Sequence, residues 1–272
     1  MKIFDFDEKF FEYTRTWIAM HPKMTEKQLE ESYNEILLNW LNAPAKWLGG
    51  EKPGEYFLRY SDPKDLMKLL EEYDKRDIGL PEPLYSRVVS LGEPCVEPLM
   101  RMVRSESNSE SLRATALAIL RDIGSDKIRP MLIDLVCQSE EADEISEMAL
   151  DQLSAGDASV VDALLERYDE AAEYGRMAIL DICSNFPGDE RVYQKLVSAL
   201  RNLPDDRALY AALLGKYGDA RAIEALKPFL TMQDIGYLDY IEVRNAVEEL
   251  GGDAGEERAF YGDPDYEAMR GM

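Results

Sequence analysis

Three cysteines and one histidine are the side chains of this sequence best suited to nucleophilic or metal chemistry. They are Cys95, Cys137, Cys183 and His21. The cysteines are far apart, form no C-x-x-C pair and stand in apolar helical segments, which predicts buried free thiols in a reducing compartment. His21 precedes Pro22 in a predicted loop and has no base–nucleophile pair nearby. We therefore predict no catalytic residue, no metal site and no cofactor.

The absence of sequence motifs for phosphate binding and acyl transfer leads to the same prediction. The chain contains no G-x-x-x-x-G-K-[ST], no G-x-G-x-x-G after a strand and no G-x-S-x-G. Carboxylate pairs could serve as acid and base, but among 54 Asp and Glu residues such pairs arise by chance. The sequence favours a protein that is not an enzyme.

The net charge of −23 restricts the classes of partner. Nucleic acids are bound by Lys and Arg that neutralise phosphates, so DNA and RNA are not expected, and anionic membrane surfaces are disfavoured as well. The charge fits a soluble, self-repelling surface or a protein partner with basic character. No run of 18 apolar residues is present and the N-terminus lacks a signal-peptide pattern, which predicts a cytoplasmic location.

One stretch of the chain stands out by its charge. From Pro130 to Glu166 there is no Lys, Arg or His, although a solvated helix surface normally carries both signs. The same stretch holds ten acids: Asp134, Glu140, Glu141, Asp143, Glu144, Glu147, Asp151, Asp157, Asp162 and Glu166. This imbalance favours either a binding surface or a solvated ridge.

An internal repeat positions these acids along the chain. Glycines recur at 92, 124, 156, 188 and 218, at intervals of about 32 residues. Four residues after them stand Val96, Ile128, Val160, Val192 and Ala222, and in four of the five units a leucine follows four places later. Self-similarity at such a period indicates stacked structural units.

Each unit reads as a pair of helices. In "RATALAILRDIGSDKIRPMLIDLV", Arg113 to Val136, the first helix carries Ala116, Leu117 and Leu120 on one face. Gly124 suits the left-handed residue that ends a helix, and an adjacent Ser or Asp can cap the next one. One hairpin cannot bury both apolar faces, so neighbouring units must stack.

The stretch "RATALAILRDIGSDKIRPMLIDL" and, more loosely, "YAALLGKYGDARAIEALKPFL" resemble the HEAT repeat, in particular its short bacterial form known from phycobilisome-lyase-like proteins. The resemblance covers about residues 82–252. It implies an all-α fold, an α-α superhelix of the HEAT/armadillo-like solenoid type, with about five helix pairs over residues 81–252. It also implies that the second helix of each pair lines the concave side.

The two ends of the chain lack the period. Residues 1–80 predict a helical N-terminal cap, with helices starting after Asp5 or Asp7, at the capping box of Thr25, and at Asp62 and Pro63. All three tryptophans fall here, so an aromatic binding surface is the alternative to a cap. Residues 253–272 predict a C-terminal helix or tail.

Four acids form the predicted partner-binding site. Asp162 and Glu166 lie on the helix side opposite the core stripe of Val160 and Leu164. Asp134 and Glu224 occupy comparable positions in other units. These residues predict an acidic concave groove for a basic peptide or protein, with a solvated ridge as the alternative.

The function predicted from the sequence is a non-enzymatic scaffold or adaptor that binds a protein partner. One alternative is a lyase-like accessory that carries a tetrapyrrole, which would require an exposed reactive thiol. The other is a HEAT-like nucleic-acid binder, for which the local basic stretch "MRMVRSE" is the available surface. The sequence identifies neither the partner nor the oligomeric state.

Overall fold

The computed structural model describes residues 2–270, so Met1, Gly271 and Met272, at the ends of the predicted cap and C-terminal region, lie outside the described residues. The described residues form helices joined by turns and contain no strand. The all-α helical-repeat class is therefore confirmed. None of the helices in residues 2–270 is both long and apolar enough to span a bilayer.

The chain forms two compact units that divide after Arg129. The boundaries predicted near residues 80 and 252 mark where the sequence period starts and stops, and the structural division falls between them. Each unit has its own buried core.

The first unit begins with helices that match the predicted capping residues. Asp5, Thr25 and Asp62 each accept a backbone N–H at the start of a helix, and Thr25 and Gln28 form the predicted capping box. Its elements are α1 (Phe6–Met20), α2 (Glu26–Asn42), η1 (Lys46–Leu48), η2 (Pro53–Arg59), α3 (Pro63–Lys75), α4 (Glu82–Leu91), α5 (Glu93–Arg104), α6 (Glu110–Ile123) and η3 (Asp126–Ile128).

An aromatic cluster joins the N-terminal segment to the rest of the first unit. The Phe6 ring contacts Trp40, with 6.0 Å between ring centroids, and Phe57 at 5.4 Å. The Tyr73 hydroxyl on α3 donates a hydrogen bond of 2.9 Å to the Phe4 carbonyl. The base of the α1–α2 hairpin is thus part of the core, as a cap requires.

The second unit continues the helix pairs. Its elements are α7 (Arg129–Gln138), α8 (Glu144–Ser154), α9 (Val160–Arg167), α10 (Glu173–Ser184), α11 (Glu190–Asn202), η4 (Pro204–Asp206), α12 (Arg207–Tyr217), α13 (Ala222–Leu230), α14 (Tyr237–Glu249) and α15 (Pro264–Arg270). Arg129, the first residue of α7, is the last residue of the first unit.

The repeat positions form the core, as the period predicts. The apolar residues four places after the glycines are at most 3% exposed, and so are Leu132, Leu164, Leu196 and Leu226. The Ser or Asp that follows the glycine accepts the backbone N–H two residues on in four units. This recurring turn starts the second helix of the pair.

Gly156 departs from the expectation for the repeat glycines. Gly124 and Gly218 end α6 and α12 in the left-handed conformation, and Gly92 and Gly188 also have positive φ. Gly156 does not, because α8 ends in a right-handed turn at Ala155. A non-glycine residue is therefore conformationally possible at 156.

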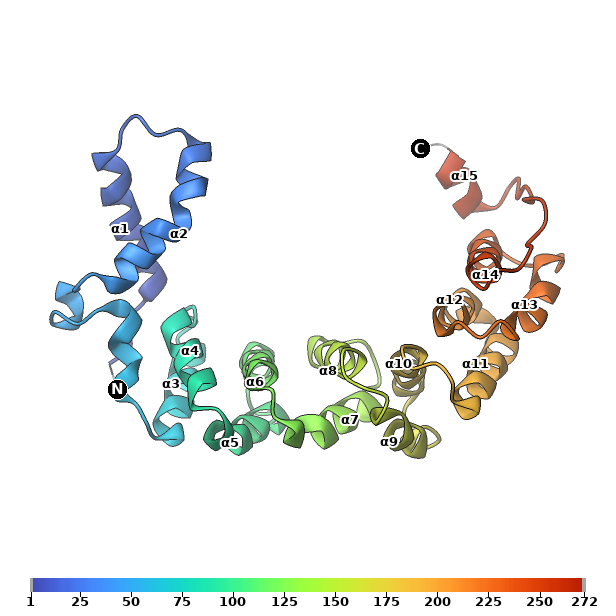
Figure 1. Cartoon of the computed structure of the whole chain (residues 1–272), viewed down its shortest axis with the longest axis horizontal. Coiled ribbons are helices and arrows are strands. Elements are labelled where there is room, and N and C mark those ends of the chain that lie inside the picture. The colour runs from blue at the N-terminus through green and yellow to red at the C-terminus, as the bar shows by residue number, and fades with distance from the viewer. Residues whose placement is uncertain (1, 271–272) are drawn as a thin grey trace. The chain divides into compact units, whose positions relative to one another are not determined.

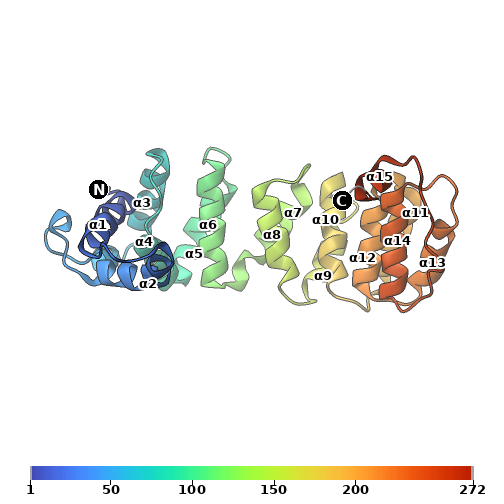
Figure 2. The same ribbon diagram turned by 90° about the horizontal axis from the view of Figure 1, so that it is seen from above.

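The helices of the second unit form two layers (Figure 1). The first helices of the pairs, α8, α10, α12 and α14, lie on the inside of this unit's curve, and α7, α9, α11 and α13 lie on the outside. Figure 2 shows α10, α12 and α14 side by side. Small residues let α12 and α14 approach closely, since a Cβ on Gly215 of α12 would lie 3.2 Å from the Ala246 Cα of α14.

Gly175 allows a second close approach, at the start of α10. A Cβ at this position would lie 2.9 Å from the carbonyl oxygens of both Val136 and Cys137. The Ala172 N–H donates to the same Cys137 carbonyl at 3.4 Å. Backbone therefore packs directly on backbone between α7 and α10.

We predict that Gly175→Ala destabilises the protein by about 1–3 kcal/mol, because the carbonyl groups it meets belong to the backbone and must move. Gly236→Ala is the matched control, since a Cβ there meets nothing within 4 Å and φ is −69°. Urea unfolding followed by circular dichroism measures both variants. Equal midpoints for the two variants would contradict the close approach.

Candidate partner-binding surfaces

The structure places the four predicted site residues on the outer layer of the second unit. Asp134 lies on α7, Asp162 and Glu166 on α9, and Glu224 on α13. The expectation that the second helices line the concave side is thus wrong for this unit. One physical reason is that Gly215 lets α12 approach α14 closely, which draws the layer of first helices together.

Two of these acids, Asp134 and Asp162, form ion pairs with arginines of the following helix pair. The Arg167 Nη1 donates to the Asp134 carboxylate at 2.8 Å, and the Arg191 Nη2 lies 2.5 Å from the Asp162 carboxylate. Asp134 raises the pKa of Arg167 through this hydrogen bond. The stretch without cations is therefore neutralised in part by cations from the next repeat.

The other two predicted residues are exposed. The Glu224 carboxylate lies 3.7 Å from Lys227 on its own helix, with 84% of its side chain exposed. Glu166 is exposed on the last turn of α9. The four acids thus do not converge on a groove, and their arrangement matches the solvated ridge that was the alternative interpretation.

A Lys or Arg at the same position of several repeats forms a series of ion pairs between neighbouring helix pairs, called here the ladder of ion pairs. Lys127, Arg191 and Arg221 each stand three residues after a repeat glycine, and each pairs with an acid of the preceding helix pair. The acids are Glu93, Asp162 and Glu190, respectively. Cations at a fixed offset from the glycines were the sequence signal that could have shown this pairing.

We predict that the Asp134–Arg167 pair contributes a coupling energy of about 0.5–1 kcal/mol, in the range of partly exposed pairs. The measurement is a double-mutant cycle with Asp134→Ala and Arg167→Ala by urea unfolding. The same cycle on Glu224 and Lys227 serves as a control and should give a coupling near zero, because that pair is longer and more exposed. A coupling that persists in 1 M salt would argue against an ion pair.

The inner layer of the second unit presents a different surface. Because α10 and α12 pack against helices on both sides and behind, their inner face is the one left open. That face carries the half-buried Tyr174 and Met177 of α10 and Leu209 and Ala212 of α12. These positions recur at steps of three, and the stripe ends in the Lys216–Asp181 ion pair of 2.7 Å.

Acids border this uncharged stripe on the neighbouring helices. Glu144, Glu147 and Asp151 are exposed on α8, at steps of three and four. On α14, Glu242 is half-buried and Glu249 is exposed. The inner face therefore combines partly covered apolar side chains with acidic edges, which suits a segment with apolar and basic residues.

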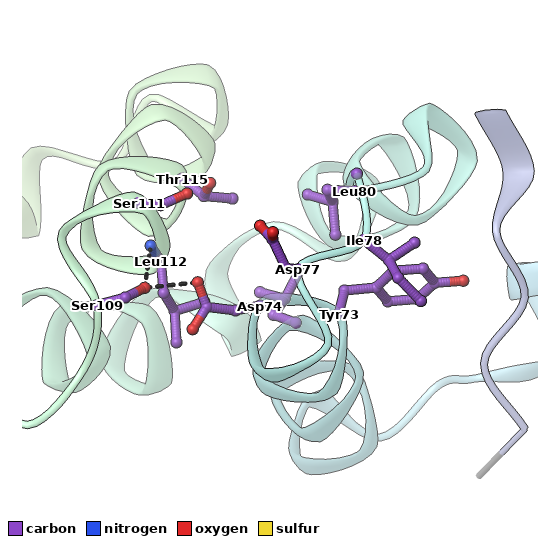
Figure 3. Close-up of a pocket in the computed structure, with 11 residues that line it drawn as sticks. Tyr73, Asp74, Asp77, Ile78, Leu80, Ser109, Ser111, Leu112 and Thr115 are labelled. Atoms are coloured by element: carbon purple, nitrogen blue, oxygen red, sulfur yellow. Dashed lines mark hydrogen bonds between the residues drawn. The ribbon is translucent and has the colours of Figure 1, made fainter. Parts of the chain in front are cut away.

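A pocket of about 390 Å³ opens in the first unit, between the end of α3 and the start of α6 (Figure 3). The Ser109 hydroxyl donates a 2.5 Å hydrogen bond to Asp74 and accepts the Leu112 N–H at 3.0 Å. Asp77 has a φ of 53°, a left-handed conformation that Asp tolerates better than most residues. The Ser109 hydroxyl thus caps α6 and is held by the Asp74 carboxylate.

The three cysteines are free and buried. Burial raises the pKa of the Cys95 and Cys137 thiols and raises the pKa of Cys183 to about 12. Within residues 2–270, no group of three or more His, Cys, Asp or Glu side chains is arranged to hold a metal ion. None of these thiols has the exposure and lowered pKa of a reactive cysteine.

We predict slow modification of all three cysteines by a thiol reagent at pH 8, because the reactive thiolate requires a pH near or above the raised pKa values. Unfolding in guanidinium should release three reactive equivalents. Ellman's reagent measures both rates. A rapidly reacting equivalent in the folded protein would contradict the burial and would favour an accessory that carries its ligand on a thiol.

The comparisons with known proteins add no relative. No protein-family model matches the chain, and no curated protein matches it significantly. The fold and the surfaces described above are therefore the basis for any functional proposal.

Proposed function

We propose that this protein is a non-enzymatic adaptor built from HEAT-like helical repeats, and that the inner face of its second unit binds a protein segment with apolar and basic residues. The uncharged stripe of Tyr174, Met177, Leu209 and Ala212, bordered by acids, is the observation that carries the proposal. Inner faces of helical repeats are extended and suited to long segments.

The charge distribution supports this surface over the outer one. Several outer-layer acids are engaged by cations of the next repeat, whereas Glu144, Glu147 and Asp151 belong to no ion pair described for residues 2–270. Unpaired acids beside an apolar stripe steer basic segments and disfavour nucleic acids. Three free, buried thiols fit a cytoplasmic location.

Photo-crosslinking tests the location of the binding surface. A benzophenone amino acid at Met177 or Leu209 should form adducts with the partner in extract of the source cells. The same residue at Glu166, on the outer layer, is the positional control. Adducts from Glu166 alone would assign binding to the outer ridge instead.

Charge reversal tests the acidic border. We predict that Glu147→Lys with Asp151→Lys weakens binding of the crosslinked partner by at least about tenfold. The matched control is Asp162→Lys with Glu166→Lys, which alters the outer layer by the same charge and should leave the affinity nearly unchanged. Both variants must first show wild-type helicity by circular dichroism.

A further inference from the structure

The α1–α2 hairpin of the first unit buries few of its apolar side chains. Along α1 only Phe6 is buried, and along α2 only Ile36 and Trp40. Helices of 15 and 17 residues gain most of their stability from a packed apolar face, so this hairpin is incompletely covered. Its exposed large apolar residues are Phe11, Ile18, Met20, Tyr33 and Leu38.

The incomplete packing extends along the hairpin to its tip. Near the base, Phe10 contacts Trp40 and Tyr33, with centroid distances of 5.2 and 5.8 Å. Figure 1 shows α1 and α2 diverging toward the loop that joins them. At that end Met20 is 66% exposed, and Tyr33, midway along α2, is 52% exposed despite its contact with Phe10.

The Phe10–Tyr33 contact joins one stripe on each helix, and the exposed Phe11, Ile18 and Leu38 lie off these stripes. On α1, Phe10, Tyr13, Trp17 and Met20 recur at steps of three and four, so they share one face. On α2, Glu26, Glu30, Tyr33 and Leu37 share a face in the same way. An aromatic stripe therefore lies opposite a stripe that starts with two acids.

The charge of the hairpin favours one kind of occupant. Residues 5–42 contain eight acids and four Lys or Arg residues. Glu26, Glu30 and Glu35 are exposed and belong to no ion pair described for residues 2–270. A second copy of this hairpin would bring acids against acids, and an anionic membrane would be repelled as well.

We propose that the α1–α2 hairpin is a second docking surface, which accepts an amphipathic helix with basic residues from a partner protein. The apolar side of that helix would cover Trp17, Met20 and Tyr33. Its Lys or Arg side chains would meet Glu26 and Glu30. Three helices then share a core that two helices do not close. This surface is independent of the inner face of the second unit.

A model peptide tests the proposal directly. The probe is a fluorescein-labelled 18-residue peptide of Leu and Lys with the leucines at helical spacing. The control peptide has the same composition in an order that forms no apolar stripe. In fluorescence anisotropy at about 0.15 M salt, the first peptide should bind at least about tenfold more tightly than the second, since both have the same charge.

Two double variants locate the site. Met20→Ser with Tyr33→Ser should weaken binding by at least about tenfold. The control, Leu238→Ser with Tyr261→Ser, removes two residues of the second unit that are also more than half exposed, and it should bind as wild type. Hydrogen exchange should slow in residues 6–42 when the peptide is added.

Three results would overturn the proposal. These are equal binding of the two peptides, equal binding by the hairpin variant and wild type, and slowed exchange confined to α8–α14. Sedimentation provides a fourth test, since a dimer that Met20→Ser with Tyr33→Ser converts to monomer would show that a second copy covers the hairpin. If no partner crosslinks to the inner face of the second unit, the proposed function fails but this proposal still stands.

Discussion

Burial of one apolar stripe per helix against the next pair is the constraint on which this structure depends. No single pair has enough core, so Val160, Val192 and their repeat equivalents are buried only because units stack. Stacking in turn requires close backbone approach at Gly175 and Gly215. Gly215 lets α12 and α14 approach within the layer of first helices, and that layer is the concave side of the second unit.

Electrostatics follows from the same stacking. A charged side chain on an outer helix lies beside the next helix pair, so an acid can pair with a cation about one repeat later in the sequence. Asp162 and Arg191 are 29 positions apart, and Glu190 and Arg221 are 31 apart. Local charge imbalance is therefore a poor guide to binding in a repeat protein, whereas charge compared at the repeat period is informative.

The fold was predictable from residues with local physical meaning. Thr25, Asp62 and Gly124 set helix ends through capping and left-handed geometry, and the leucines eight residues after the glycines identified the core. Which helices form the inner face was not predictable, because curvature depends on small residues meeting across helices, as Gly215 meets Ala246. An aromatic surface in residues 1–80 was the alternative to a cap, but the sequence could not show which residues stay open, since Trp40 and Met20 look equally apolar but differ in coverage.

The ladder of ion pairs has a consequence for how such a chain can change in length. Lys127, Arg191 and Arg221 hold the same offset from their own repeat glycine, and each pairs with an acid of the helix pair before it. Gain or loss of a whole helix pair would keep that offset, whereas insertion of a few residues would misalign it. Growth by duplication of entire units is therefore the change in length that this architecture tolerates best.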